Sequence, residues 1–167
     1  MHTLIVILWG VVLSLFAMSA PARSLPTIPS GAHGVLTITS VKVGSLPFLH
    51  GLTGEGRYLT YNAQGELCQA APVKLIAGAR TGDRIGFGER EDIELVVYSE
   101  IISKRLLAGQ KTVSIDFNID YQMHNPRTDI QITQGLLREE GFILHPHKAW
   151  SSWFGVHSNT LKCHLLK

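Results

Sequence analysis

Apolar and polar residues alternate along much of the chain after residue 34. In the clearest run, Lys111 to Met123, Val113, Ile115 and every second residue up to Tyr121 are apolar, whereas the residues between them are polar. Successive side chains of a strand point to opposite faces, so this run predicts a strand with one face in water. One-sided strands of this kind are typical of antiparallel sheets.

Shorter alternating runs predict further strands at residues 35–42, 57–62, 72–77, 93–98, 129–133, 142–145 and 160–166. Helical spacing is limited to Glu100–Leu107, after Ser99 as a capping residue, and to one or two turns between Thr133 and Gly141. Turn residues at 62–65 and 108–110 fit hairpin loops. The pattern predicts a mainly β fold: an antiparallel β-sandwich or irregular β-barrel with one or two short helices, with an α+β roll as the alternative.

The N-terminal segment has the features of an export signal. Residues 4–18 form an apolar run of 15 residues without a charge, whereas a membrane-spanning helix needs about 20. Ala20 and Ala22 supply the small residues of a cleavage site, so we expect cleavage after Ala22. Because no Lys or Arg precedes the run, an uncleaved anchor flanked by Arg23 stays open as the alternative.

These features divide the chain into three parts. Residues 1–22 are expected to be a signal peptide, residues 23–34 an extended N-terminal arm with Pro and Gly, and residues 35–167 a single β-rich domain. The protein would then be exported, either periplasmic or secreted, and without a stable membrane span after cleavage. In an oxidising compartment Cys68 and Cys163 are expected to form a disulfide.

Charge and composition narrow the classes of partner. Only 17% of the residues are charged, the net charge is +2, and no long basic run is present. Nucleic acid is therefore not an expected partner. The charged and glycine-containing stretch at residues 82–92 lacks the spacing of a phosphate-binding loop and is expected to be a surface loop.

Both tryptophans outside the signal lie within four residues of each other, which makes this segment the first candidate binding site. Trp150, Trp153 and Phe154 could stack on sugar rings or anchor a protein partner, with Lys148 and His147 at the rim. The alternative is a hydrophobic plug that closes one end of the sheet.

Histidines near the C-terminus form the second candidate site. His145 and His147 are two residues apart, so on an extended backbone both imidazoles would point the same way. His157 or His164 would complete a zinc or copper site. The alternative is a surface loop with unrelated histidines.

No catalytic residue is assigned, because nucleophile motifs such as GxSxG are missing from the sequence. The first functional hypothesis is therefore an exported binding domain that recognises a protein or glycan partner and needs no cofactor. One alternative is a metal-binding protein or metal-dependent hydrolase that uses the C-terminal histidines. Another is a pilus-like subunit of a surface polymer. The oligomeric state stays open.

The tryptophan hypothesis predicts that Trp153→Ala abolishes partner binding and leaves the thermal midpoint nearly unchanged. A surface tryptophan contributes contact area to the complex but little to the core. Calorimetry of the unfolding transition and titration with the partner check the two effects. A large fall in the midpoint would show instead that Trp153 belongs to the core.

Overall fold

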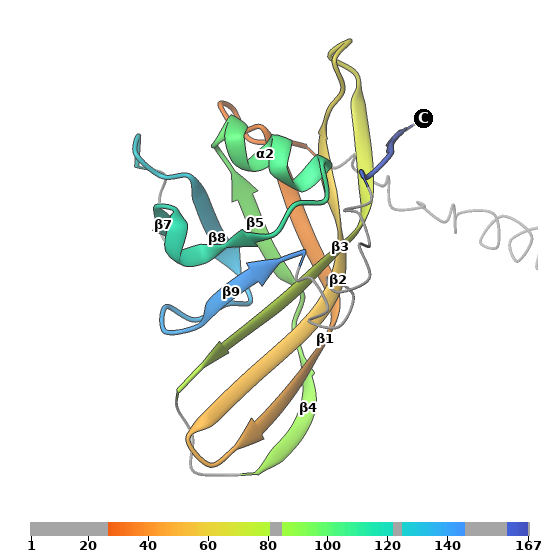
Figure 1. Ribbon diagram of the computed structural model, residues 1–167. Coiled ribbons are helices and arrows are strands. Elements are labelled where there is room, and N and C mark those ends of the chain that lie inside the picture. Colours follow the sequence, from red (N-terminus) through yellow and green to blue (C-terminus); the bar gives the residue numbers. More distant parts are fainter. Residues whose placement is uncertain (1–26, 81–84, 122–124, 146–159, 167) are drawn as a thin grey trace, which may run out of the picture.

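A computed structural model describes residues 27–80, 85–121, 125–145 and 160–166. Within these ranges all strands belong to one sheet. Their order across the sheet is β6 (Thr112–Val113), β9 (Gly141–Leu144), β3 (Leu67–Ala79), β2 (Leu49–Tyr61), β1 (Gly34–Leu46), β5 (Ile93–Val97), β8 (Ile130–Gln134) and β7 (Ile119–Asp120). In addition, β10 (Cys163–Leu165) pairs with β3, and β4 (Gly86–Arg90) pairs with β1. The sheet is open and curls into a half-barrel (Figure 1). The mainly β class is confirmed.

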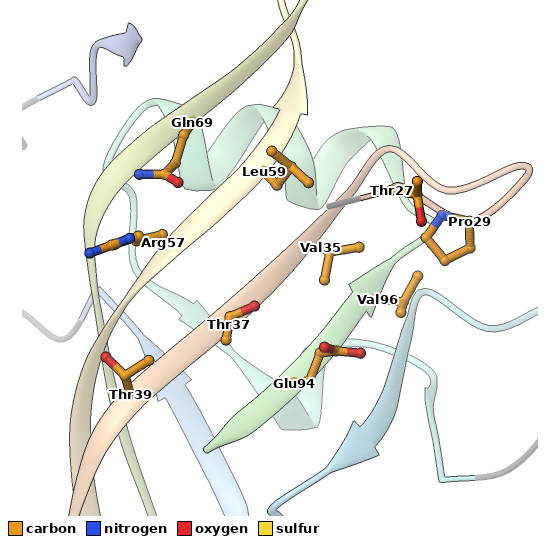
Figure 2. A pocket seen from close by; sticks show the side chains of 10 residues that line it. All are labelled: Thr27, Pro29, Val35, Thr37, Thr39, Arg57, Leu59, Gln69, Glu94 and Val96. Atoms are coloured by element: carbon orange, nitrogen blue, oxygen red, sulfur yellow. The ribbon is translucent and has the colours of Figure 1, made fainter. Parts of the chain in front are cut away.

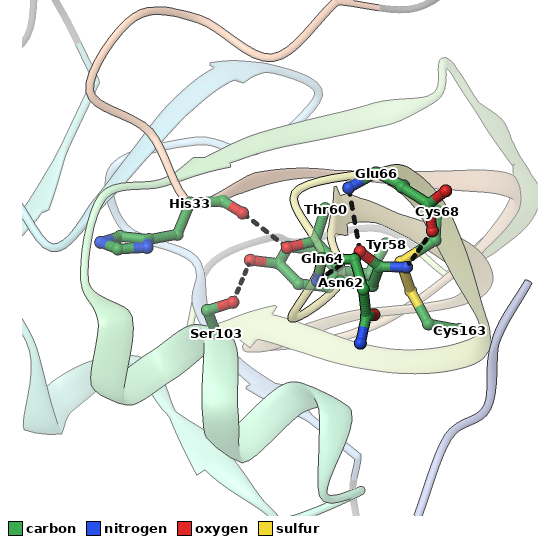
Figure 3. Close-up of a disulfide and its surroundings, with 9 residues drawn as sticks. All are labelled: His33, Tyr58, Thr60, Asn62, Gln64, Glu66, Cys68, Ser103 and Cys163. Atoms are coloured by element: carbon green, nitrogen blue, oxygen red, sulfur yellow. Dashed lines mark hydrogen bonds between the residues drawn. A yellow bond between two sulfur atoms is a disulfide. The ribbon is translucent and has the colours of Figure 1, made fainter. Parts of the chain in front are cut away.

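Three long strands form the centre of the sheet. β1 (Gly34–Leu46), β2 (Leu49–Tyr61) and β3 (Leu67–Ala79) have 13 residues each and are joined by tight hairpins. Figure 3 shows the second hairpin, where the Asn62 carboxamide oxygen accepts the backbone N–H groups of Gln64 and Glu66, each at 2.9 Å. The hairpin expected at residues 62–65 is confirmed.

Two short strands lie end to end along the other edge of β1. β5 (Ile93–Val97) pairs with residues 34–38, and β4 (Gly86–Arg90) pairs with residues 41–45. The remaining strands extend the two sides of the sheet: β6 (Thr112–Val113), β7 (Ile119–Asp120), β8 (Ile130–Gln134), β9 (Gly141–Leu144) and β10 (Cys163–Leu165).

The helix α2 (Glu100–Leu107) covers one end of the sheet (Figure 1), and the helix predicted over these residues is confirmed. Ser99 occupies the N-cap position, but its side chain makes no capping hydrogen bond. Its residues Ile102 and Leu106 are fully buried in the core. The Tyr58 hydroxyl of β2 donates a hydrogen bond of 2.9 Å to Ser103 of the helix. Burial of this phenol raises the pKa of Tyr58 to about 12, so it stays protonated and keeps its donor at all physiological pH values.

The long strand predicted at residues 111–123 is wrong. Between residues 111 and 121 the chain forms β6, the 3-10 helix η1 (Ser114–Asp116) and β7 instead of one continuous strand. Two backbone N–H groups near this segment donate to side chains and not to a neighbouring strand. The N–H of Phe142 donates to the Ser114 hydroxyl at 3.0 Å, and the N–H of Asn118 donates to the Asp129 carboxylate at 3.0 Å. Ile115, expected on the buried face, is 88% exposed.

Three other expectations need correction. Residues 82–92, expected to be a loop, contain β4. Residues 108–110 end α2 instead of forming a hairpin, because Gly109 adopts φ +64° and Gln110 donates to the carbonyl of Arg105. Residues 133–141 form no helix, and Gly135 at φ +85° leads out of β8 into a turn.

The expected disulfide between Cys68 and Cys163 is present and joins residues 95 positions apart (Figure 3). Cys163 begins β10, which pairs with residues 68–70 of β3. The bond therefore fastens the C-terminal strand to the centre of the sheet. No helix among the described residues is long and apolar enough to cross a membrane.

We expect the double variant Cys68→Ala with Cys163→Ala to unfold more easily, by roughly 3–5 kcal/mol. Without the bond the unfolded chain regains the freedom of a loop of this length. Urea denaturation of the wild-type and double-variant proteins measures the difference. An unchanged midpoint would show that pairing of β10 on β3 holds this end of the sheet without the covalent bond.

Candidate binding groove

Four glycines form one row across four neighbouring strands. Gly44 on β1 lies opposite Gly51 on β2, which lies opposite Gly78 on β3. Gly78 in turn lies opposite Gly141 on β9, and Phe87 on β4 lies opposite Gly44 and ends the row. Directly opposed residues share a face of the sheet. A strip of bare backbone about 14 Å long therefore crosses this end of the sheet.

The glycine row lies on the face of the sheet that points away from the core. Leu52 directly follows Gly51, and Ala77 directly precedes Gly78. Both Leu52 and Ala77 are buried in the core. Because side chains alternate along a strand, the glycines belong to the opposite, outer face.

Apolar side chains border the glycine row on both sides. Leu46 and Leu49, opposite each other next to the first hairpin, form one side, and Ile76 and Ile143, also a cross-strand pair, form the other. Together with the row they enclose a hollow of about 480 Å³, which we call the apolar groove. A glycine inside a strand often marks a position where a ligand or another chain approaches the backbone closely.

Not all four glycines are needed for packing within the protein. A Cβ atom at Gly51 would come no closer than 3.9 Å to another atom, and one at Gly44 would meet only the Phe87 ring at 3.6 Å. Gly78 differs, because a Cβ there would lie 2.6 Å from the backbone oxygen of His50. The fold therefore requires Gly78, whereas Gly44 and Gly51 leave space that no described residue fills.

Large apolar side chains are exposed around the same end of the sheet. Their exposed fractions are 50% for Leu46, 81% for Phe48, 53% for Leu49, 70% for Ile85 and 85% for Phe87, and we call these five residues the apolar tip. Figure 1 shows that this end of β1, β2 and β4 projects away from α2. Contiguous exposed apolar surface on a small domain marks an interaction site.

Phe48 has an unusual backbone conformation. It follows Pro47 in the two-residue loop between β1 and β2 and adopts φ +66°. This region favours glycine or asparagine, and a bulky residue there costs about 1–2 kcal/mol. The loop thus holds an exposed phenyl ring at a position where glycine would be more stable, and strain of this kind is found at functional sites.

A buried carboxylate supports the sheet on the face opposite the groove. The side chain of Glu140 is 1% exposed, and the guanidinium of Arg90 donates to its two oxygens at 2.7 and 2.8 Å. The backbone N–H of Leu137 donates to the same carboxylate at 2.9 Å. Glu140 therefore joins the loop before β9 to β4, which carries Arg90.

His50 links the same carboxylate to the groove. The Nδ1 atom of His50 is hydrogen-bonded to the Ser45 hydroxyl at 2.8 Å. The Nε2 atom lies 3.4 Å from Glu140 Oε1, which is within ion-pair distance for a protonated ring. Nε2 makes no hydrogen bond, however. The order Ser–His–Glu superficially matches a catalytic triad. However, Arg90 donates to both carboxylate oxygens, and Nε2 of His50 makes no hydrogen bond to either of them. We assign the cluster a structural role.

A second hollow, of about 430 Å³, lies on the outer face at the other end of the sheet (Figure 2). Val35, Leu59 and Val96 form its apolar part, and Thr27 and Pro29 of the N-terminal arm border it. Its polar side chains come from four strands: Thr37, Thr39, Arg57, Gln69 and Glu94. The hollow lies between residues 27–29 and the outer face of the sheet.

Most of the predicted site residues lie outside the described ranges. These are His147, Lys148, Trp150, Trp153, Phe154 and His157. The tryptophan and histidine hypotheses therefore stay predictions.

Two of the four predicted metal ligands are described. The N–H of His145 donates to Lys74 of β3, and His164 on β10 lies opposite Gln69 of the same strand. These positions on β3 are about 16 Å apart. The described residues contain no group of three or more potential ligands.

The sequence analysis did not find the apolar groove. Its available signal was the glycines at 44, 51, 78 and 141, which fall inside stretches of strand-forming residues. No protein-family model matches the chain, and no curated protein or solved structure matches it significantly. The geometry of the groove and the apolar tip therefore carries the functional argument.

We expect Glu140→Gln to lower the free energy of unfolding by about 3 kcal/mol, because it leaves the Arg90 charge without its carboxylate. Hydrogen exchange of the β4 amides should also become faster. Urea denaturation and exchange mass spectrometry check both effects. Adding Arg90→Met to Glu140→Gln should recover part of the loss; an equal loss in single and double variants would contradict this role of the pair.

Proposed function

We propose that this protein is an exported binding domain that holds a partner protein at the apolar groove and the apolar tip. The observation that carries the proposal is the row of four glycines, bordered by exposed Leu, Ile and Phe side chains, on the outer face of the sheet. It supports binding because Gly44 and Gly51 leave open space that packing within the domain does not explain.

The chemistry of the groove favours a protein over a glycan. Among the residues that line it, only Ser45 and His50 carry polar side chains, and these two are hydrogen-bonded to each other. A sugar would need donors and acceptors for its hydroxyl groups, whereas apolar side chains of a protein need none. The exposed rings of Phe48 and Phe87 can serve as anchors in such an interface.

Export is supported by two features. The apolar N-terminal segment has the length of a signal peptide and not that of a membrane span. The disulfide between Cys68 and Cys163 is of the kind that persists in an oxidising compartment. The partner is then a protein met outside the cytosol.

Site-specific photo-crosslinking tests the proposal. A benzophenone amino acid replaces Phe48 in one variant and Ile101, which is 63% exposed on α2 at the other end of the sheet, in the control. We expect position 48 alone to give a protein adduct, which is identified, purified and titrated with the wild-type domain. Adducts with lipid, or equal adducts at both positions, would overturn the proposal.

With that purified partner, we expect Gly51→Val to lower the affinity at least tenfold. The new side chain fills the groove, while the fold gains roughly 0.5–1 kcal/mol because glycine is unfavourable inside a strand. Phe48→Gly should likewise weaken binding and stabilise the fold by about 1 kcal/mol. Ile101→Ala is the control: it removes a side chain that is 63% exposed on α2, at the other end of the sheet, and should bind normally.

A further inference from the structure

The outer edge of β4 has no strand partner among the described residues. One edge of β4 pairs with residues 41–45 of β1. β5 lies end to end with β4 along β1, and its own outer edge is covered by β8. β8 does not extend as far as β4, and no other described strand lies along the outer edge of β4. The backbone donors and acceptors on this edge are therefore available for a further strand.

β4 lacks most of the devices that protect edge strands. Its sequence, Gly-Phe-Gly-Glu-Arg, contains neither lysine nor proline. A Cβ atom at Gly86 or Gly88 would meet nothing within 4 Å, so nothing in the described chain covers this strand on that face. The one charged side chain of β4 that points inward, Arg90, forms an ion pair with Glu140. Of the usual devices, β4 keeps its short length and one exposed charge, Glu89.

Charge and hydrophobicity change along this edge. Ile85 and Phe87 at its beginning are exposed and apolar. Glu89, Glu91 and Asp92 at its end are exposed, and none of them has an ion-pair partner among the described residues. A segment that lies along β4 therefore meets hydrocarbon at one end and three carboxylates at the other.

We propose that a partner polypeptide adds an antiparallel strand to the outer edge of β4, with basic residues at its start and apolar residues at its end. Antiparallel addition places the start of the segment beside the carboxylates and its end beside Phe87 and the apolar tip. This inference rests on the proposed function and names the form in which the partner binds. Main-chain hydrogen bonds would supply affinity, and alternate side chains would supply specificity.

The same pattern disfavours a second copy of the chain as the occupant. If β4 paired with β4 of another copy about a two-fold axis, Ile85 and Phe87 of one copy would face Glu89 and Glu91 of the other. Apolar groups would then cover carboxylates, although Lys42 of β1 lies opposite only one of them, Glu89. A basic and apolar segment from another protein matches this edge better.

Synthetic peptides test the inference directly. The probe is the octapeptide Lys-Lys-Thr-Lys-Thr-Val-Thr-Val, capped at both ends, and its control is the same sequence in reverse order. We expect the forward peptide to slow hydrogen exchange at residues 86–90 and to bind at least tenfold more tightly than the reversed one. Equal binding of the two peptides, or slowed exchange only outside β4, would overturn the inference.

Backbone methylation separates strand addition from general stickiness. Two forms of the forward peptide carry N-methyl groups at alternate residues, one at the odd and one at the even positions. Only one set of amides can face β4, so we expect one form to lose binding and the other to keep it. Loss in both forms or in neither would contradict a strand partner.

A variant of the protein completes the test and distinguishes the two proposals. Gly88→Lys places a lysine on the edge strand where space is open, and should abolish peptide binding, whereas Ile115→Lys should not. The purified partner is then titrated with Gly51→Val and Gly88→Lys. If only Gly51→Val weakens that complex, strand addition is wrong and the groove function stands. If neither variant weakens it, both proposals are wrong.

Discussion

The whole structure depends on a mismatch of length between the central strands and the helix that covers them. β1, β2 and β3 have 13 residues each, so they extend about 44 Å. α2 has eight residues and extends about 12 Å. The helix can bury one end of the sheet only. The continuous ladder carries the other end past the core, where no helix or second sheet from the described residues covers it (Figure 1).

The uncovered end keeps its shape through contacts that the core does not provide. Backbone pairing to β1 holds β4, and the buried carboxylate of Glu140 holds Arg90 at its end. The Ser45 and His50 pair ties the last residues of the hairpin together. These polar contacts lie beneath the groove, while the outer face carries bare backbone and hydrocarbon. The protein thus combines a rigid polar support with an apolar surface.

The sequence predicted the class of fold, because alternation of apolar and polar residues reports directly on a sheet with one buried face. It also predicted α2, the hairpin at 62–65 and the disulfide. It failed at residues 111–123, where the alternation is as regular as any in the chain. There Ser114 and Asp129 offer hydrogen bonds that compete with a ladder. Such competition depends on residues distant in sequence. The alternation of apolar and polar residues within one segment therefore cannot predict it.

The groove escaped prediction for a related reason. Gly44, Gly51, Gly78 and Gly141 look like isolated breaks in strand patterns, and only the register of four strands brings them into one row. Register in turn depends on the hairpins and on the bulges between residues 39 and 42 and between 56 and 58. The sequence drew attention to the tryptophans, which lie outside the described residues, since single conspicuous side chains can be read without register.

The contact between Arg90 and Glu140 also has a mechanical consequence. A strand held along one edge only would peel away under tension, one hydrogen bond at a time. Because Glu140 directly precedes β9, a pull on β4 is shared with β9 and through it with β3, on the far side of the sheet. A pull on β4 would then load several strand pairs of the sheet together instead of the β1–β4 pair alone.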